Sequence, residues 1–447
     1  MAARDSPGMV RRMNRVEKKQ SREEGAWIVS VRLLERWREQ EERVDWLLET
    51  VSAETSRVER ARIHALLVGA VRHLGRIDGH LTRLMARPPR PLVWAALVVA
   101  GFELLEGGSE GHSARVGHHL VDQLKRVVTA KEAGFANAVV RKLATAIEAE
   151  AMPTAGDSMV IWSRYHSHPD WMVQRWWEQF GEKATQELLQ WNQSPAPVLV
   201  RWRPGSTEDL IKPEWLHPVA ETTDFFAADP GHWAELAEFI EAGTVQVQDA
   251  ATRLAVDLLN PIAGETVLDL CAAPGGKSLA MADRMQQGAV VAMDLMGRRM
   301  PRLEENLRRV PAGITATAVA GDLLRGGARA LAAKELPTEY SAVLVDVPCS
   351  NSGVMRHRVD VKWRLKPESF RRHALQQLDL LTAAGERVAE GGRIVYSTCS
   401  IDPEENGQVV AAFERRSRGA FELVDSRISY PWETGHDGAA AFLLRRV

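Results

Sequence analysis

Three cysteines are the side chains of this 447-residue sequence best suited to covalent chemistry: Cys271, Cys349 and Cys399. Each lies where a buried strand is expected to end. An exposed thiolate is a good nucleophile, and helix N-termini or nearby cations favour the thiolate form. A thiolate that adds to carbon 6 of a pyrimidine makes carbon 5 able to attack an activated methyl group. Buried strand-end cysteines are otherwise small hydrophobic side chains, which is the interpretation that we favour for Cys271.

The number and spacing of these cysteines exclude other uses. A small odd number at wide spacing argues against a disulfide framework and for a reducing compartment, so we expect a cytoplasmic protein. No pair has the spacing of zinc ligands, and we expect no metal.

No apolar run is long enough to span a membrane. The net charge of −2 is not that of a polycation, so nucleic-acid binding would depend on local basic patches.

A glycine-rich turn lies in the stretch Glu265–Ser278, whose sequence is E-T-V-L-D-L-C-A-A-P-G-G-K-S. A strand that leads through such a turn into a helix N-terminus commonly holds a nucleotide-like ligand. A phosphate-binding loop would need a glycine where Cys271 stands, and the spacing of a dinucleotide site is absent. A site for S-adenosylmethionine (SAM) needs only a tight turn and acids downstream. An ordinary strand-to-helix turn is the remaining alternative.

Acidic residues follow the next three predicted strands in order: Asp294, Asp322 and Asp346. In a parallel sheet the ligand lies beyond the carboxyl ends of the strands. An acid after the second strand can bind a ribose diol, and an acid after the third can accept from an adenine amino group. Each acid alone is weak evidence, because acids after strands often cap helices. Together, on one edge, they indicate a SAM site.

Alternating strands and helices must position these residues, and the alternation begins at about Val245. The expected strands are Val267–Leu270, Val290–Asp294, Thr315–Gly321, Ala342–Asp346 and Arg393–Ser397. Helices are expected between them, for example over Arg298–Arg309 and Phe370–Val388. This alternation predicts a doubly wound, mostly parallel α/β sheet. Ala440–Arg446 is expected to form an antiparallel edge strand.

The N-terminal part of the chain has a different character. Apolar positions at helical spacing predict a helical bundle, with helices over Trp27–Glu39 and Val58–Met85. Basic residues between Arg115 and Lys142 more often mark solvated faces, but their clustering is also compatible with an RNA-facing surface. A capped helix is expected over Trp171–Phe180, after His168-Pro169.

The segment between these two parts is rich in tryptophan and proline. Val198–Arg203 has the sequence V-L-V-R-W-R and predicts a strand that carries arginines. Aromatic side chains interleaved with arginine are compatible with base stacking. Tryptophans at helical spacing are more often part of a core, and we favour the core interpretation.

Three motifs resemble those of the NOL/NOP/Sun RNA (cytosine-5) methyltransferases. They are Leu268–Lys277, then Asp346-Val347-Pro348-Cys349-Ser350, then Ser397-Thr398-Cys399-Ser400 with Pro403-Glu404-Glu405-Asn406. The helices before them resemble the NusB-like RNA-binding domain of the RsmB branch, through Phe135–Arg141 and His168-Pro169-x-Trp171. The resemblance covers nearly the whole chain after a basic N-terminal tail, and the two cysteine motifs are highly specific.

The resemblance implies a role for each motif. Cys399 is the implied nucleophile at carbon 6, Cys349 assists release of the product, and Asp346 faces the cytosine. The implied cofactor contacts are Cys271, Ala272, Ala273, Pro274, Gly275, Gly276, Lys277, Asp294, Asp322 and Asp346. The implied RNA-facing neighbours are Arg299, Arg356, Arg358 and Lys362.

The sequence departs from the family pattern at three places. Val359 stands where the family usually has proline, and Arg203 replaces the usual asparagine of its strand. Ala439-Ala440 lack the aromatic side chains that commonly follow the Asp-Gly pair. These departures concern RNA fit and target choice more than methyl transfer.

The resulting expectation is a Rossmann-like class I SAM-dependent methyltransferase domain over residues 245–447, preceded by an all-α NusB-like domain over residues 21–150. Residues 1–20 are expected to be a disordered basic tail, and residues 151–244 a small α+β RNA-binding segment. The implied reaction is methylation of carbon 5 of a cytosine in small-subunit (16S) ribosomal RNA. Transfer RNA as substrate and a non-catalytic assembly role are the alternatives. The expected partner is RNA, with no membrane and no metal, and a monomer is favoured.

Overall fold

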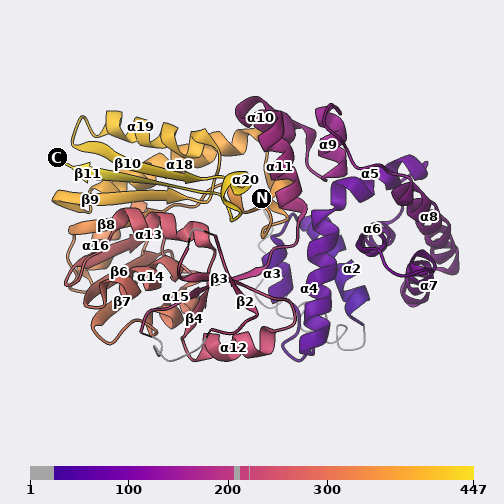
Figure 1. The fold of residues 1–447 in the computed structure, drawn as a ribbon, viewed down its shortest axis with the longest axis horizontal. Helices are drawn as coiled ribbons and strands as arrows, with labels where there is room; N and C mark the ends of the chain where they lie inside the picture. The colour runs from indigo at the N-terminus through magenta and orange to yellow at the C-terminus, as the bar shows by residue number, and fades with distance from the viewer. Residues whose placement is uncertain (1–24, 206–211, 221) are drawn as a thin grey trace, which may run out of the picture. The chain divides into compact units, whose positions relative to one another are not determined.

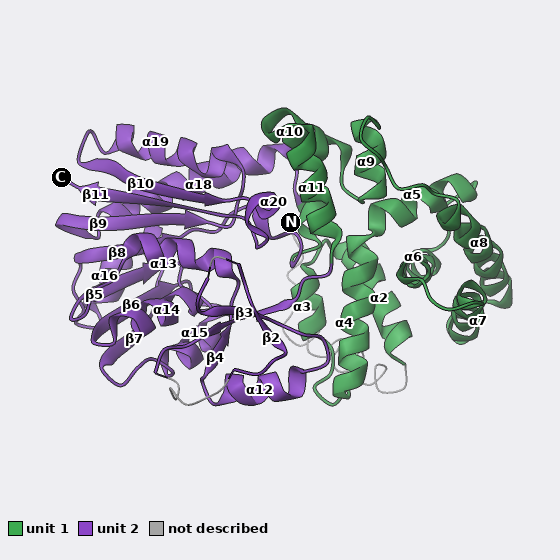
Figure 2. Ribbon diagram, viewed as in Figure 1, with its two compact units in different colours: residues 1–194, 358–364 green, residues 195–357, 365–447 purple. Residues whose placement is uncertain are grey.

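The computed structural model describes residues 25–205, 212–220 and 222–447, with the elements labelled in Figure 1. The tail expected over residues 1–20 lies outside the described residues. The chain divides into two compact units (Figure 2). Unit 1 runs to Ser194 and includes a return segment, Arg358–Arg364, whereas unit 2 contains Pro195–His357 and Leu365–Val447.

Unit 1 is helical in its described residues, which confirms the expected bundle. Its core surrounds α6, a helix that is apolar on all sides and buried along most of its length. No helix of the described residues is long and apolar enough to cross a membrane. The helices are α2 (Ala26–Gln40), α3 (Val44–Glu49), α4 (Arg57–Arg72), α5 (Leu74–Leu84), α6 (Pro91–Glu106), α7 (His112–Leu124), α8 (Ala130–Glu148), α9 (Met159–Tyr165), α10 (Asp170–Phe180), α11 (Glu182–Gln193) and α17 (Val361–Arg364).

Two expected details of unit 1 are wrong. The single helix expected over Val58–Met85 is interrupted at His73, where α4 ends and α5 follows. The apolar spacing continues across this break, so periodicity alone does not reveal it. The helix after Pro169 begins at Asp170, and Pro169 provides no side-chain cap.

Unit 2 begins with a small antiparallel sheet of strand order β2-β3-β1-β4. Its core contains Val200, Phe226 and Leu236. The segment expected over residues 151–244 is thus shared, since α9 to α11 belong to unit 1. The domain boundaries given above stay a prediction. The elements are β1 (Val198–Trp202), β2 (Leu216–Pro218), β3 (Phe225–Ala228), α12 (Trp233–Glu241), β4 (Val245–Val247), η1 (Ala250–Thr252) and α13 (Arg253–Leu259).

A seven-stranded sheet forms the rest of unit 2, with strand order β10-β11-β9-β8-β5-β6-β7. The five strands from β9 to β7 are parallel, as expected, and the last two pair antiparallel. The elements are β5 (Thr266–Leu270), α14 (Gly276–Met285), β6 (Gly288–Asp294), α15 (Met300–Leu307), β7 (Ile314–Ala320), η2 (Leu323–Arg325), α16 (Gly327–Ala332), β8 (Tyr340–Asp346), η3 (Ser352–Val354), α18 (Pro367–Gly385), β9 (Val388–Thr398), η4 (Pro403–Glu405), α19 (Gly407–Arg416), β10 (Phe421–Ser429), α20 (Pro431–Thr434) and β11 (Ala439–Arg446).

The antiparallel end of this sheet corrects one expectation. The strand expected at the edge, now β11, is an inner strand between β9 and β10. The edge is formed by β10, whose residues between Phe421 and Ser429 are exposed, so it lacks the apolar alternation that marks a strand in a sequence.

The parallel strands bring their carboxyl ends to one edge of the sheet. The interior strands β5 and β8 are fully buried over Val267-Leu268 and Ala342–Val345. The chain builds β5, β6 and β7 outward and then returns to β8 on the other side of β5. The strand order therefore reverses between β5 and β8, and such a reversal is where open α/β sheets bind their ligands.

Candidate active site

The turn after β5 is tight and depends on its glycine. Gly275 has a φ of 99° and immediately precedes α14. A Cβ atom on Gly275 would lie 2.9 Å from Leu303 of α15, so a larger residue would be both strained and crowded. Cys271 also has a positive φ, of 59°. The backbone thus folds closely into the helix N-terminus, as a site for a small ligand requires.

The acid at the end of β6 is bound to this turn. Asp294 is buried, and its Oδ2 accepts the Ala273 N–H at 2.8 Å. Its Oδ1 accepts the Leu295 N–H at 2.7 Å. The acid after β7, Asp322, accepts the Leu324 N–H at 2.9 Å and caps η2. Asp294 is therefore fixed beside the glycine turn. Asp322 caps a helix, which is the alternative that the sequence left open for an acid after a strand.

The acid at the end of β8 forms an ion pair with the lysine of the turn. Lys277 Nζ lies 2.7 Å from Asp346 Oδ2, and the Ser397 hydroxyl donates to Asp346 Oδ1 at 2.6 Å. Burial alone would lower the pKa of Lys277, but the Asp346 carboxylate and the nearby Cys399 raise it above its usual value. The ammonium group therefore keeps its positive charge beside the cysteine loops.

The two cysteines of the specific motifs lie together. Cys349 Sγ and Cys399 Sγ are 3.0 Å apart, at the ends of the adjacent strands β8 and β9. Cys349 is buried, and its hydrogen bond with Cys399 and its burial raise its pKa well above the usual thiol value. Cys399 is partly exposed and lines a cavity of about 50 Å³ together with Lys277. Cys349 is thus suited to remain a thiol, and Cys399 is the more accessible sulfur.

The third cysteine, Cys271, differs from this pair in its surroundings. Burial, followed by the charges of Asp294 and Asp346, raises the pKa of Cys271 far above the usual thiol value. Its side chain packs against the apolar core of the sheet. A thiol that stays protonated in apolar surroundings agrees with the interpretation of Cys271 as a small hydrophobic side chain.

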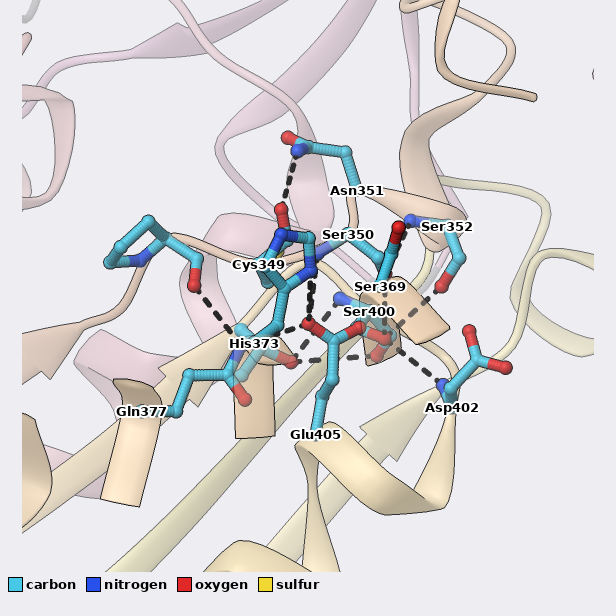
Figure 3. A network of polar contacts seen from close by, with 12 residues as sticks. Cys349, Ser350, Asn351, Ser352, Ser369, His373, Gln377, Ser400, Asp402 and Glu405 are labelled. Carbon is cyan, nitrogen blue, oxygen red and sulfur yellow. Dashed lines mark hydrogen bonds and ion pairs between the residues drawn. The ribbon is translucent and has the colours of Figure 1, made fainter. Parts of the chain in front are cut away.

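Hydroxyl groups of serines join the two cysteine loops (Figure 3). Ser350 and Ser400, which follow the two cysteines, are hydrogen-bonded at 3.2 Å. Ser352 adds a second contact to Ser400 at 3.1 Å. Asn351 Nδ2 donates to the Cys349 carbonyl at 2.8 Å. The loops are therefore one hydrogen-bonded unit.

Sequence reasoning missed several residues of this edge. Asp269, Asn351, Ser397 and Glu405 contact predicted site residues or their motifs, yet none was assigned a role. All four stand inside or beside the motifs, and proximity to a cysteine or glycine motif is the signal that could have identified them. Asp269 and Asn351 contact residues close to them in the sequence. The partners of Ser397 and Glu405 lie about 50 residues away and could not be read from the sequence.

The residues expected to face RNA have different surroundings. Arg299 is exposed and donates to the Ala273 carbonyl at 3.3 Å. Arg356 donates to the Pro195 carbonyl, and burial lowers its pKa. Arg358 pairs with Asp45 at 3.5 Å.

Lys362 contradicts its expected role as an RNA contact. Its side chain is buried, and its ammonium group donates to the Arg72 carbonyl at 2.8 Å within unit 1. Desolvation lowers its pKa well below the usual lysine value. A buried amine committed to a backbone carbonyl is not placed to bind a phosphate.

Two arginines, Arg201 in β1 and Arg203 directly after it, are also buried and paired. Arg201 and Arg203 both contact the Asp283 carboxylate at 2.7 Å, and Arg201 also donates to Gln248. Beside them lies a cavity of about 780 Å³ whose described lining contains none of the predicted site residues. These two arginines are therefore part of the buried structure of unit 2.

Solved structures share this architecture. The crystal structure of PH0851 matches with a TM-score of 0.73 and 20% identity, over 94% of this chain and 99% of the other. The structure of a methyltransferase homologue from Pyrococcus horikoshii matches with a TM-score of 0.54 and 22% identity, over 65% of this chain and 100% of the other. These similarities establish the fold: a Rossmann-like sheet flanked by helices.

The residues at the edge of the sheet fit a SAM-dependent methyltransferase. The glycine turn, the fixed carboxylate of Asp294 and the Lys277–Asp346 pair provide hydrogen-bonding groups suited to a ribose and an amino acid moiety. Two family descriptions match the chain: the NusB family over residues 26–145 and the 16S rRNA methyltransferase RsmB/F over residues 256–437.

Curated relatives extend the match over most of the chain. The ribosomal RNA small subunit methyltransferase B of Vibrio cholerae is 33% identical over 387 residues, which is 83% of this chain and 86% of the relative. That of Vibrio vulnificus is 31% identical over 403 residues, 86% of this chain and 90% of the relative. The chain belongs to the RsmB/F family of 16S rRNA methyltransferases, and its cofactor is SAM.

Proposed function

We propose that this protein methylates carbon 5 of a cytosine in 16S ribosomal RNA through a covalent bond between Cys399 and carbon 6. The observation that carries the proposal is the 3.0 Å approach of the Cys349 and Cys399 sulfur atoms beside the Lys277–Asp346 pair. Methyl transfer to a nitrogen or oxygen would need no thiol, whereas carbon 5 requires activation by a nucleophile.

The proposed reaction starts with the more accessible thiol. The Cys399 sulfur bonds to carbon 6 of the ring, and Asp346 stabilises the ring at nitrogen 3. SAM held at this edge would supply the methyl group: its methyl–sulfur bond would break as the bond to carbon 5 forms, and the sulfur would keep the electron pair as a thioether. A base then removes the carbon-5 proton, and the electron pair of that bond expels Cys399 as a thiolate.

Cys349 is proposed to assist that last step. Because its pKa is raised, it remains a thiol whose proton can be donated to the departing Cys399 sulfur at 3.0 Å. The thiolate that leaves is thereby stabilised, and carbon–sulfur cleavage becomes more favourable.

The proposal also assigns residues that bind SAM and residues that contact RNA. The turn from Cys271 to Lys277 with Asp294, Asp322 and Asp346 is proposed to bind SAM. Arg299, Arg356 and Arg358 stay proposed RNA contacts. The target cytosine must leave its stack to reach the sulfur atoms. The relatives are named for small-subunit ribosomal RNA, which favours this substrate over transfer RNA, and we place the reaction in the cytoplasm.

Trapping the protein–RNA adduct tests this chemistry. Cys349→Ala, incubated with SAM and 16S ribosomal RNA as naked transcript or small-subunit particle, should accumulate a complex that survives denaturing electrophoresis. Attack by Cys399 persists in this variant while release fails. Cys399→Ala and the double variant should form neither the complex nor methylated RNA. A Cys349→Ala protein with normal turnover and no adduct would contradict the two-cysteine mechanism.

A further inference from the structure

A fully buried carboxylate lies behind the two cysteine loops (Figure 3). Glu405 is on η4, and its Oε1 accepts the Ser350 backbone N–H and the Gln377 side-chain amide, each at 2.9 Å. The His373 Nδ1 lies 3.3 Å from the same oxygen. Burial alone would raise the pKa of Glu405, but hydrogen bonds from His373, Ser350 and Ser400 lower it. The group is therefore a carboxylate whose Oε1 is surrounded by donors.

Glu405 fixes the backbone that carries Cys349. The peptide following Cys349 is held at both polar groups: its N–H donates to Glu405, and its carbonyl accepts from Asn351 Nδ2 at 2.8 Å. The preceding carbonyl, of Pro348, accepts from Gln377 Nε2 at 3.0 Å. That same amide group binds Glu405, so the carboxylate acts on the loop directly and through Gln377. Because the Cys349 side chain has few rotatable bonds, fixing its peptide also fixes the position of its thiol.

The loop of the other cysteine contacts Glu405 through Ser400, but its remaining contacts come from a different residue. The Asn406 side chain accepts from the Thr398 hydroxyl at 2.6 Å and donates to the Ser400 carbonyl at 2.9 Å. The Cys399 carbonyl accepts the Gly353 N–H at 3.0 Å. Removing the Glu405 carboxylate therefore takes the contact at Ser350 and the link through Gln377 from the Cys349 loop. The Cys399 loop loses only its Ser400 contact and keeps both contacts with Asn406.

We propose that Glu405 is a positioning residue for Cys349, and that its loss impairs release of the RNA rather than attack on it. The inference rests on the proposed function, because it assigns Glu405 to one of the two thiol roles. A misplaced Cys349 cannot donate a hydrogen bond to the departing Cys399 thiolate, so the covalent adduct persists.

Glu405→Gln tests the assignment, with Glu404→Gln on the same short helix as the matched control. Turnover by Glu405→Gln should fall by about tenfold to a hundredfold, as expected for a misplaced catalytic group. The protein–RNA adduct that survives denaturing electrophoresis should accumulate as in Cys349→Ala, and the KM for SAM should not change. Glu404→Gln should match the wild type in all three measurements. A role in folding alone would lower turnover without accumulating the adduct.

Two results would overturn the inference: equal turnover in the two glutamate variants, or reduced turnover of Glu405→Gln without adduct. If Glu405→Gln does not fold, Gln377→Met removes the amide link between Pro348 and Glu405 at similar size, and the same outcomes apply. A wild-type protein that methylates no cytosine, together with a Cys349→Ala protein that forms no adduct, would instead refute the proposed function.

Discussion

At the scale of single residues, the edge of the sheet contains a carboxyl group that resists ionisation. Asp269 is fully buried on β5, where its Oδ2 accepts the Ser278 hydroxyl. Its Oδ1 has no hydrogen-bond partner among the described residues. Burial raises the pKa of Asp269 from 3.8 to about 7, with a smaller lowering by the Ser278 hydroxyl and a smaller raising by the Asp346 charge. The group is thus protonated in the folded chain at a pH where an unfolded aspartate is ionised.

This shift predicts a pH-dependent effect of Asp269→Asn. Between 3.8 and about 7 the folded state binds more protons than the unfolded state, so the contribution of Asp269 to stability falls as pH rises. Asparagine cannot ionise. The free energy of unfolding of the variant, relative to that of the wild type, should therefore rise by about 1.4 kcal/mol for each pH unit in this range. Urea unfolding of both proteins across this pH range measures the difference. A difference that does not change with pH would contradict the raised pKa.

Residue types located the side chains at this edge of the sheet better than the contacts that hold them in place. The cysteine and glycine motifs could be located because their chemistry needs particular residues at particular spacings. The Ser350–Glu405 bond and the Lys277–Asp346 pair join residues far apart in the sequence, so they depend on the finished sheet. Lys362 was misjudged because a lysine is usually solvated, whereas here it donates to a buried carbonyl.

At the scale of elements, two strand-end loops are held together by backbone contacts. The Gly353 N–H donates to the Cys399 carbonyl at 3.0 Å, and the Gly438 N–H donates to the Gly353 carbonyl at 2.8 Å. The buried strands that carry these loops could be predicted from their apolar runs. The exposed edge strand β10 and the inner place of β11 could not, because pairing order is set by tertiary packing.

Gly353→Ala should damage this junction. A Cβ atom there would lie 2.5 Å from the Gly438 carbonyl oxygen and 2.9 Å from that of Cys399, and backbone atoms cannot move aside cheaply. We expect a loss of about 1–3 kcal/mol in stability, as for other overpacked sites, together with reduced turnover. Gly407→Ala is the control, since its Cβ would meet nothing within 4 Å at the start of α19. Thermal unfolding and methylation assays compare them, and equal results for both variants would refute the crowding argument.

At the scale of the whole molecule, the chain passes between the two units three times. The return segment Arg358–Arg364 belongs to unit 1, although it lies within the residues that match the RsmB/F family. There Lys362 and Trp363 donate to the Arg72 and Val71 carbonyls. The NusB-like unit is therefore completed by residues from the middle of the methyltransferase sequence, an arrangement that local sequence patterns do not indicate.

Bisulfite sequencing of 16S ribosomal RNA tests the central claim most directly. The RNA is taken from cells that carry the gene, from cells that lack it, and from cells that carry only Cys399→Ala. The proposed chemistry predicts a cytosine that is protected from conversion in the first cells and converted in both others. Protection that persists in cells lacking the gene, or that survives in cells with Cys399→Ala, would contradict methylation of carbon 5 by this site.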